Sequence, residues 1–284
     1  MTTFAPSKRV PLAISQRIQV RQMDNPIPAN VPKFWFNNNP VLTAMLAAFS
    51  VGFPAGERFF MDSVRHFQTA ITDPVLQDEI RGFIGQEAQH TKQHVLFNQF
   101  LDERGYPATF YAETARKVLT KLQARSTPAA NLARTAALEH FTAILADAML
   151  GHPEVMDQIH PSIAKLWVWH AIEEVEHRNV AFDVYKQVVD DEALRLREMM
   201  LITVGFITTI SLRTVMMQVT TGAGFQPKAF KEALNTLWGK PGIFRKAIPQ
   251  YFAYYRKDFH PSQHDNSHKV EAAKKRWLAE YEPH

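Results

Sequence analysis

The chain of 284 residues is long enough for one large domain or two small ones, and it can bury a sizeable core. Its composition, 46% hydrophobic and 21% charged, is ordinary for a folded protein and excludes a disordered one. The net charge of +4 from 32 basic and 28 acidic residues is too balanced for a dedicated nucleic-acid binder, and the lack of cysteine excludes disulfides and thiolate metal sites.

Residues 1–38 predict an irregular N-terminal arm to which the sequence assigns no chemistry. The basic and proline residues that mark it are Arg9, Arg17, Arg21, Pro26, Pro28 and Pro32. Met1 to Val10 contains no long apolar run, so we expect no signal peptide and a cytoplasmic protein. From Pro40 a helical pattern runs to about Thr72. Pro54 within it indicates either a kink just before Glu57 or two consecutive helices.

A second long helix is predicted from Pro74 to Glu103, with Asp73 as its N-cap and Gly105 just beyond its end. Polar groups stand in the middle of an otherwise apolar stripe on this helix. The stripe consists of Phe83, Glu87, His90, His94, Phe97 and Leu101. A shorter and more charged helix over residues 110–124 is expected to be peripheral.

A third bundle helix is predicted from Thr127 and Pro128 to about Gly151, with Glu139 on its apolar face. Small alanine neighbours leave room around Glu139 for a metal ion and a substrate. A fourth helix is predicted over residues 161–189. Its inward face carries Trp167, His170, Glu174, His177 and Ala181.

The stretch from Met199 to Leu212 is uncharged, and Arg213 follows it. These fourteen residues fall short of the roughly 20 that span a bilayer, so we expect a helix buried against the bundle. The alternative is contact with a membrane surface through residues 199–219. The tail, 227–284, predicts two or three helices in which basic and aromatic residues are mixed.

Two Glu-x-x-His motifs, Glu87 to His90 and Glu174 to His177, carry the main chemical signal. Positions i and i+3 lie on one helix face, so a carboxylate and an imidazole can share one metal ion. Each motif has a lone upstream glutamate, and a four-helix bundle builds a two-metal carboxylate site from this arrangement. His170 precedes Glu174 by four residues and adds a ligand. The candidate metal ligands are Glu57, Glu87, His90, Glu139, His170, Glu174 and His177.

Four glutamates facing one apolar core cannot all be charged unless cations neutralise them, because an unpaired buried carboxylate costs several kcal/mol. Two divalent ions would balance these charges. Oxygen and nitrogen ligands without sulfur suit two iron ions, with manganese or zinc as alternatives. No further catalytic or cofactor-binding residue is predicted.

Neighbours of the candidate ligands are expected to have lesser roles. We expect His94 to lie beside the ligands or in the core rather than to bind metal. Glu173 and Glu176 point off the ligand face, so we expect them to be solvated or paired with Arg178. Asp147 could orient a ligand histidine, because metal-bound imidazoles usually have such a partner.

At these residues the chain resembles the family of predicted metal-dependent hydrolases within the ferritin-like di-iron superfamily. The resemblance covers roughly residues 30–280, and its most distinctive blocks are Gly85–His90 and Trp167–His177. The added His170 is similar to the pattern of the di-iron p-aminobenzoate N-oxygenases, and no position of that seven-ligand pattern is missing. The resemblance implies an all-α, ferritin-like four-helix bundle within a single domain, 39–284. Its core bundle would be 40–190 and its C-terminal helical extension 191–284.

Relatives in natural-product pathways act as di-iron hydroxylases, so the resemblance favours a non-haem di-iron monooxygenase. Such an enzyme activates O2 to hydroxylate or N-oxygenate a mostly apolar small molecule. The alternative is a dinuclear metal-dependent hydrolase using a metal-activated water. Against it, the ligand stripes contain no arginine or lysine to hold an oxyanion. A third class, iron storage or a structural bundle, fits poorly with the long tail after residue 190.

The expected partners follow from this chemistry. An oxygenase of this kind needs an electron donor, a ferredoxin or a reductase. The basic, aromatic tail could dock an acidic ferredoxin or an acyl-carrier partner, although a solvated face is the simpler interpretation. No nucleic-acid partner is expected, and a homodimer is left open.

Overall fold

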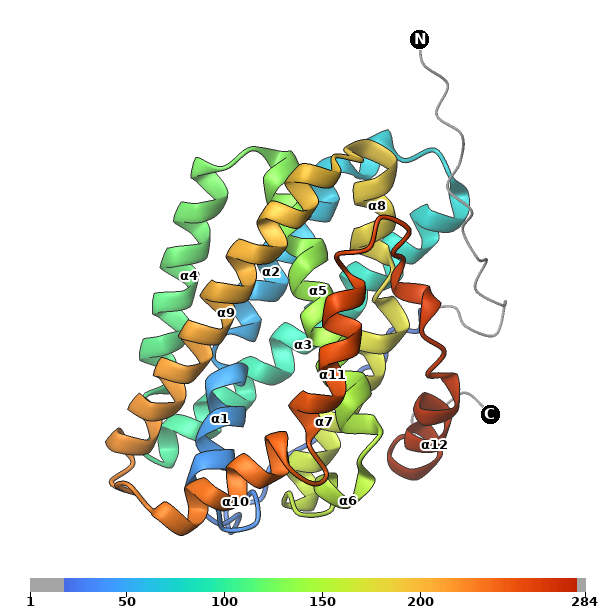
Figure 1. The fold of residues 1–284 in the computed structure, drawn as a ribbon. Helices are drawn as coiled ribbons and strands as arrows, with labels where there is room; N and C mark the ends of the chain where they lie inside the picture. Colours follow the sequence, from blue (N-terminus) through green and yellow to red (C-terminus); the bar gives the residue numbers. More distant parts are fainter. Residues whose placement is uncertain (1–17, 280–284) are drawn as a thin grey trace.

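Helices dominate the computed structural model, which describes residues 18–279 (Figure 1). No β-strand occurs between residues 18 and 279, where the only bridge is an isolated antiparallel one between Phe36 and Ile159. The prediction of an all-α protein is therefore confirmed. Arg9, Arg17 and the segment Met1 to Val10 lie outside the described residues, as do residues 280–284 of the tail.

The elements follow one another with short connections. In chain order they are α1 (Pro40–Ser50), α2 (Phe53–Phe67), the 3-10 turn η2 (Gln68–Ala70), α3 (Pro74–Glu103), α4 (Ala108–Arg125), α5 (Pro128–Leu150), α6 (Pro153–Met156), α7 (Pro161–His177), α8 (Val180–Val188), α9 (Glu192–Thr220), α10 (Pro227–Trp238), α11 (Ile243–Ala253), η3 (Pro261–Gln263) and α12 (Ser267–Trp277). The tail thus forms three α-helices within its described part, in line with the prediction.

The first predicted helix is two consecutive helices, which was one of the two interpretations of Pro54. Val51 and Gly52 separate α1 from α2, and Pro54 lies in the first turn of α2. A proline is well tolerated there because its missing N–H would have no intrahelical partner. The side chain of Asn39 caps α1 by accepting hydrogen bonds from the backbone N–H groups of Val41 and Leu42.

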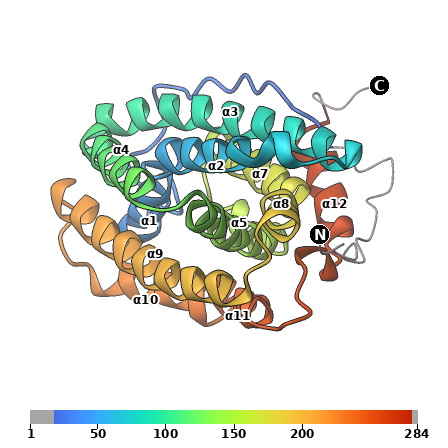
Figure 2. The ribbon, with the colours of Figure 1, turned by 90° about the horizontal axis from the view of Figure 1, so that it is seen from above.

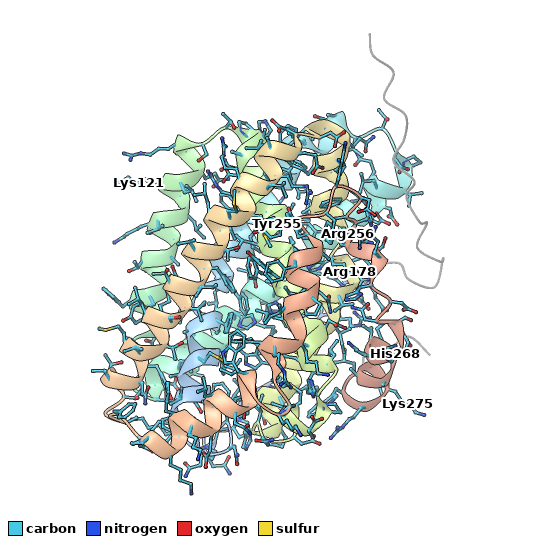
Figure 3. All side chains as sticks on the ribbon, viewed as in Figure 1. Lys121, Arg178, Tyr255, Arg256, His268 and Lys275 are labelled. Carbon is cyan, nitrogen blue, oxygen red and sulfur yellow. The ribbon has the colours of Figure 1, made fainter. Side chains whose placement is uncertain are left out.

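The second long helix and the third bundle helix agree closely with their predicted bounds, as α3 and α5. Asp73 caps α3 by accepting a hydrogen bond from the Val75 N–H, and Thr127 caps α5 in the same way from Ala130. Helix α4 is peripheral, as expected, because only Ala108 and Ala115 in it are buried. Figure 3 shows Lys121 of this helix projecting at the edge of the molecule.

The prediction of one continuous helix over residues 161–189 is wrong. Helix α7 ends at His177, a turn at Arg178 and Asn179 follows, and α8 begins at Val180. The Arg178 guanidinium donates hydrogen bonds to the His264 carbonyl oxygen at 2.7 Å and to the Asn266 side chain. The C-terminal segment therefore anchors the chain at the break, immediately after the last candidate ligand.

Helices α2, α3, α5, α7 and α8 lie side by side in the interior, while α9, α10 and α11 form a layer along one side (Figure 2). The described part of the N-terminal arm runs along α3 on the other side. It fits closely there because α3 has glycine beneath it: a Cβ at Gly82 would lie 2.7 Å from Ile18, and one at Gly85 would lie 2.5 Å from Val20. The missing side chains of these two glycines thus leave the space in which the arm packs against α3.

The expectation that residues 199–212 form a buried helix is wrong. They belong to the longer helix α9, whose inner side packs on α1 and α5 through Met199 and Met217 while its outer side is exposed. By length and composition, two stretches of the described chain could cross a membrane: Pro40–Ala70, whose apolar window is 61% buried, and Glu192–Thr220, whose window is 6% buried. The first is largely a core segment, and the second is not.

Candidate metal centre

Four helices bring the seven predicted side chains into one buried cluster. Helix α2 contributes Glu57, α3 contributes Glu87 and His90, α5 contributes Glu139, and α7 contributes His170, Glu174 and His177. Every one of these side chains is buried. The spacing within α3 and α7 places the paired ligands one turn apart, as the Glu-x-x-His motif requires.

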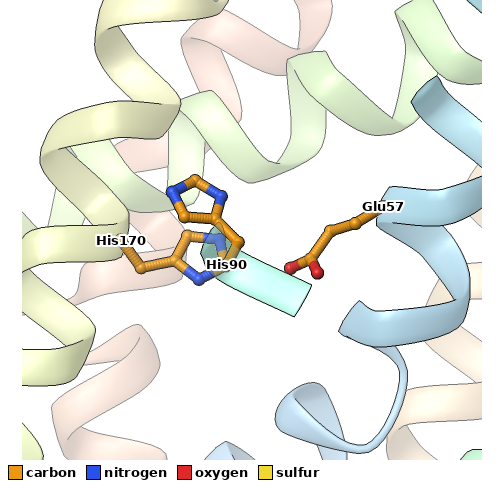
Figure 4. A group of neighbouring side chains, drawn as sticks. All are labelled: Glu57, His90 and His170. Carbon is orange, nitrogen blue, oxygen red and sulfur yellow. The ribbon is translucent and has the colours of Figure 1, made fainter. Parts of the chain in front are cut away.

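Three overlapping groups within this cluster could each hold a metal ion. In each group, one ligand atom per residue lies within 4.8 Å of the others. The groups are Glu57 with His90 and His170, Glu87 with His90 and Glu174, and Glu87 with Glu139 and His177. Together they contain all seven predicted residues. Figure 4 shows Glu57 across from His90 and His170, whose rings are stacked with centroids 4.1 Å apart.

The separations between donor atoms fit an ion between them. His177 Nε2 lies 3.2 Å from a Glu87 oxygen, 3.4 Å from a Glu139 oxygen and 3.6 Å from a Glu174 oxygen. His90 Nδ1 lies 3.7 Å from a Glu174 oxygen and 4.0 Å from a Glu87 oxygen. Two atoms that each bind one metal at about 2 Å lie roughly 3 to 4 Å apart.

Partnerless polar atoms give the strongest indication of a metal. Eight buried atoms of the cluster have no hydrogen-bond partner among residues 18–279. They are Glu57 Oε1, both oxygens of Glu87, both oxygens of Glu139, Glu174 Oε2, His90 Nδ1 and His177 Nε2. Such atoms are rare and costly in folded proteins. All eight belong to predicted ligands, so the residues present fit divalent metal ions.

Burial favours the protonated form of three carboxyl groups in the cluster, those of Glu57, Glu87 and Glu139. Burial raises the pKa of Glu57 and of Glu87 well above the usual range, and it raises the pKa of Glu139 to about 7. Burial lowers the pKa of His90 well below its usual range. Burial also acts to lower the pKa of His177, but the nearby carboxylates of Glu139 and Glu174 raise it overall. Cations would replace the carboxyl protons.

Each candidate histidine has its second ring nitrogen engaged by a partner outside the cluster. The pairs are His90 Nε2 with Glu173 at 3.0 Å, His177 Nδ1 with Gln86 at 2.8 Å, and His170 Nδ1 with His94 Nε2 at 2.7 Å. The other nitrogen of each ring therefore faces the cluster, which is how partners orient metal-binding imidazoles. The expected place of His94, beside the candidate ligands, agrees with this geometry.

The expectation for Glu173 and Glu176 is wrong, because both are held by Arg21 rather than solvated or paired with Arg178. Arg21 Nη1 lies 3.2 Å from Glu173 and 2.8 Å from Glu176. Trp169 donates to Glu173 at 3.0 Å, so Glu173 is fixed behind His90. The arm that the sequence left without chemistry thus supplies a buried cation next to the cluster. The Trp169–Glu173 spacing of four residues was the local signal that could have predicted a buried Glu173.

Two other polar residues differ from expectation. Asp147 does not orient a candidate ligand, because it accepts hydrogen bonds from Gln250 and Lys269, each at 2.7 Å, on the C-terminal side of α5. Asp147 lies two turns after Glu139 on α5, which places it beyond the end of the cluster. Thr91 was missed by the sequence, and it donates to Glu57 Oε2 at 2.7 Å. It lies four residues after Glu87 on α3, one turn further along the helix.

Two hollows approach the cluster from different sides. A cavity of about 70 Å³ reaches His170 and Glu174, and its wall is almost entirely apolar, including Phe53, Trp167 and Phe206. A polar groove of about 570 Å³ lies between α2, α3 and α4 and includes Thr91, Arg58 and Arg116. The apolar cavity therefore reaches two candidate ligands, whereas the groove reaches Thr91, the hydrogen-bond partner of Glu57.

These features define an all-α protein with a buried carboxylate–histidine cluster of the kind that binds divalent metal ions. A family model described as predicted metal-dependent hydrolase matches residues 19–265, and the chain belongs to this family. The resemblance to the family of predicted metal-dependent hydrolases is thereby confirmed. No curated protein and no solved structure gives a significant match.

Proposed function

We propose that α2, α3, α5 and the α7–α8 pair form a ferritin-like four-helix bundle whose seven candidate ligands hold two metal ions. The eight partnerless atoms of the cluster are the observation that carries this proposal. Within 39–284, the core 40–190 would hold the site, and the extension 191–284 would cover it.

Two groups that share no residue support two ion positions. They are Glu57 with His90 and His170, and Glu87 with Glu139 and His177. Glu174 reaches both, because one of its oxygens lies 2.8 Å from His170 Nε2 and the other lies 3.6 Å from His177 Nε2. Glu174 would thus share its one negative charge between the two ions. The four glutamates together carry four negative charges, which two divalent ions would balance.

The reaction that the apolar cavity favours is oxygenation of a mostly apolar small molecule by a non-haem di-iron enzyme. Iron, when bound, supplies the activation of O2. The chain's own residues bind the substrate by apolar burial and exclude water from the reacting group. Phe53 packs against His170, with ring centroids 4.6 Å apart, and so lines the cavity beside the cluster. Hydroxylation by one O2 also consumes two electrons and two protons and releases water, so a ferredoxin or reductase is required.

Hydrolysis by a metal-activated water is the second candidate. The description of the family supports it directly, and the polar groove beside Thr91 offers room for a polar substrate. Against it, Arg21 is engaged with Glu173 and Glu176 behind His90 and does not face the cluster. The arginines of the groove line a different side from the apolar cavity.

One experiment separates the two reactions. The protein is purified from iron-supplemented cells, its metals are quantified, and the reduced form is mixed with O2 in a stopped-flow spectrometer. About two irons per chain with a transient visible band and O2 consumption would support the oxygenase. Zinc or manganese, no reaction with O2 and turnover of ester or amide substrates would instead establish the hydrolase.

A further inference from the structure

From Met200 to Val219 the outer side of α9 carries no charged residue, and most of its exposed side chains are apolar. The exposed residues recur at helical spacing and are 54–68% exposed: Met200, Val204, Ile207, Leu212, Val215 and Val219. A surface helix of a globular protein normally carries polar residues on that side. The inner side of α9 packs on α1 and α5, whereas its outer side is left exposed by residues 18–279.

The apolar surface continues onto the neighbouring helices of the same layer. Both views place α9, α10 and α11 on one side of the molecule (Figures 1 and 2). Phe225, Phe230, Leu234 and Trp238 are exposed in and just before α10, and Phe252 is exposed in α11. Large contiguous apolar surfaces of this kind mark interaction sites rather than ordinary solvent-facing surface.

Positive charge accompanies this surface. Residues 199–253 contain six basic side chains and one acidic side chain, a net charge of +5, whereas the whole chain carries only +4. The exposed cations are Lys228, Lys231, Lys240, Arg245 and Lys246. An apolar helix face with adjacent lysine, arginine and tryptophan is the pattern of a segment that lies in the interface of an anionic membrane.

We propose that the outer face of α9, α10 and α11, here called the α9 face, docks on the surface of an anionic lipid bilayer. A second copy of the chain is a poorer occupant, because a twofold interface would bring the same cations of both copies together. A helix α9 that crosses the bilayer is also a poorer solution. Leaving the bundle would strip Glu198 of Arg134, which lies 2.7 Å away, and Arg195 of the Tyr254 carbonyl oxygen.

The same three helices also form the outer wall of the apolar cavity. Phe206 from α9, Leu237 from α10 and Phe244 from α11 line one side, and His170 and Glu174 lie on the other. A substrate dissolved in lipid would therefore enter the cavity through the docked layer without crossing water. This entry route rests on the proposed function, whereas docking itself does not.

Vesicle flotation with the full-length protein tests the docking. Vesicles of phosphatidylcholine alone and vesicles containing phosphatidylserine are compared at low and high salt. We expect binding to the anionic vesicles at low salt. The double variant Lys228→Gln/Lys231→Gln should reduce the partition coefficient by roughly 10- to 30-fold, since each cation near an anionic surface contributes a factor of roughly three to five. Val204→Asp/Ile207→Asp should reduce it by roughly tenfold or more.

Val75→Asp is the matched control. Val75 is as exposed as Ile207 but lies at the start of α3, on the far side from the α9 face, so this variant should bind vesicles like the parent protein. Circular dichroism checks that every variant is folded. Removing metals with a chelator should leave vesicle binding unchanged. If the protein binds vesicles but does not react with O2, only the proposed function is overturned.

Three results would overturn the docking proposal. The first is a parent protein that stays unbound in all vesicles. The second is equal loss of binding in Val75→Asp. The third is a dimer by sedimentation that becomes monomeric in Val204→Asp/Ile207→Asp, without vesicle binding, because that would make a second copy the occupant of the α9 face.

Discussion

Replacing Glu139 with glutamine should stabilise the metal-free protein. Glu139 is buried in the cluster, and neither of its carboxylate oxygens has a hydrogen-bond partner among residues 18–279. Burial raises its pKa to about 7 from an ordinary value of 4.5. The folded state therefore binds this proton more tightly than the unfolded state, and stability falls as the pH rises from about 4.5 to about 7. Glutamine has the same shape and no proton to lose.

The size of the effect follows from that pKa. A rise from 4.5 to about 7 corresponds to about 3 kcal/mol of stability lost by the parent once Glu139 is ionised. Metal-free Glu139→Gln should thus exceed the metal-free parent by about 3 kcal/mol near pH 8 and by less than about 1 kcal/mol near pH 5. Added metal should reverse the order even near pH 8, since the parent gains about 4.1 kcal/mol at a metal concentration of about 1,000 Kd.

Urea denaturation of chelator-treated protein at the two pH values measures this difference. Glu113→Gln is the control, because Glu113 is exposed on α4 and pairs with Arg116 at the surface, so its loss should leave the unfolding free energy unchanged at both pH values. If Glu139→Gln were no more stable than the parent near pH 8 while the control behaved as expected, Glu139 would not lie in an unneutralised buried cluster.

Three further variants test the surroundings of the site. Gln86→Leu removes the partner of His177 Nδ1 and should weaken metal binding by roughly 10- to 100-fold in a chelator competition assay, with the ligands intact. Arg21→Met leaves the buried Glu173 without its cation, although Glu176 keeps Lys274, and should lower the unfolding free energy by about 3 to 5 kcal/mol, while adding Glu173→Gln should recover part of this loss. Phe206→Trp narrows the cavity and should lower turnover of large substrates without changing the metal content. Unchanged metal affinity in Gln86→Leu, unchanged stability in Arg21→Met or unchanged turnover in Phe206→Trp would contradict the role given to that residue.

The candidate ligands could be predicted from the sequence because their pattern is local. Glu87 with His90 and Glu174 with His177 need only a helix to lie on one face. The helix starts at Asp73 and Thr127 were equally local, since a cap and a following proline specify them. Residues that act across the bundle gave no such signal. Arg21 meets Glu173 across 152 positions of sequence, and nothing in the arm marks it as a buried cation.

Two other differences arise from tertiary contacts. The break after His177 depends on Arg178 reaching His264 and Asn266, which an apolar period in α7 and α8 cannot reveal. Whether the outer side of α9 is exposed depends on whether another part of the protein packs against it. An apolar stretch looks the same in sequence whether protein or lipid packs against it, so the length of the uncharged run led to the wrong prediction of a buried helix.

The most direct test of a two-metal site is the metal content of the folded chain compared with that of a ligand variant. Inductively coupled plasma mass spectrometry should find about two divalent ions per chain in the parent protein. Glu87→Ala, which removes a member of two of the three groups, should bind one ion or none and remain helical by circular dichroism. A folded parent that binds no metal from an excess of iron, manganese or zinc would contradict the account.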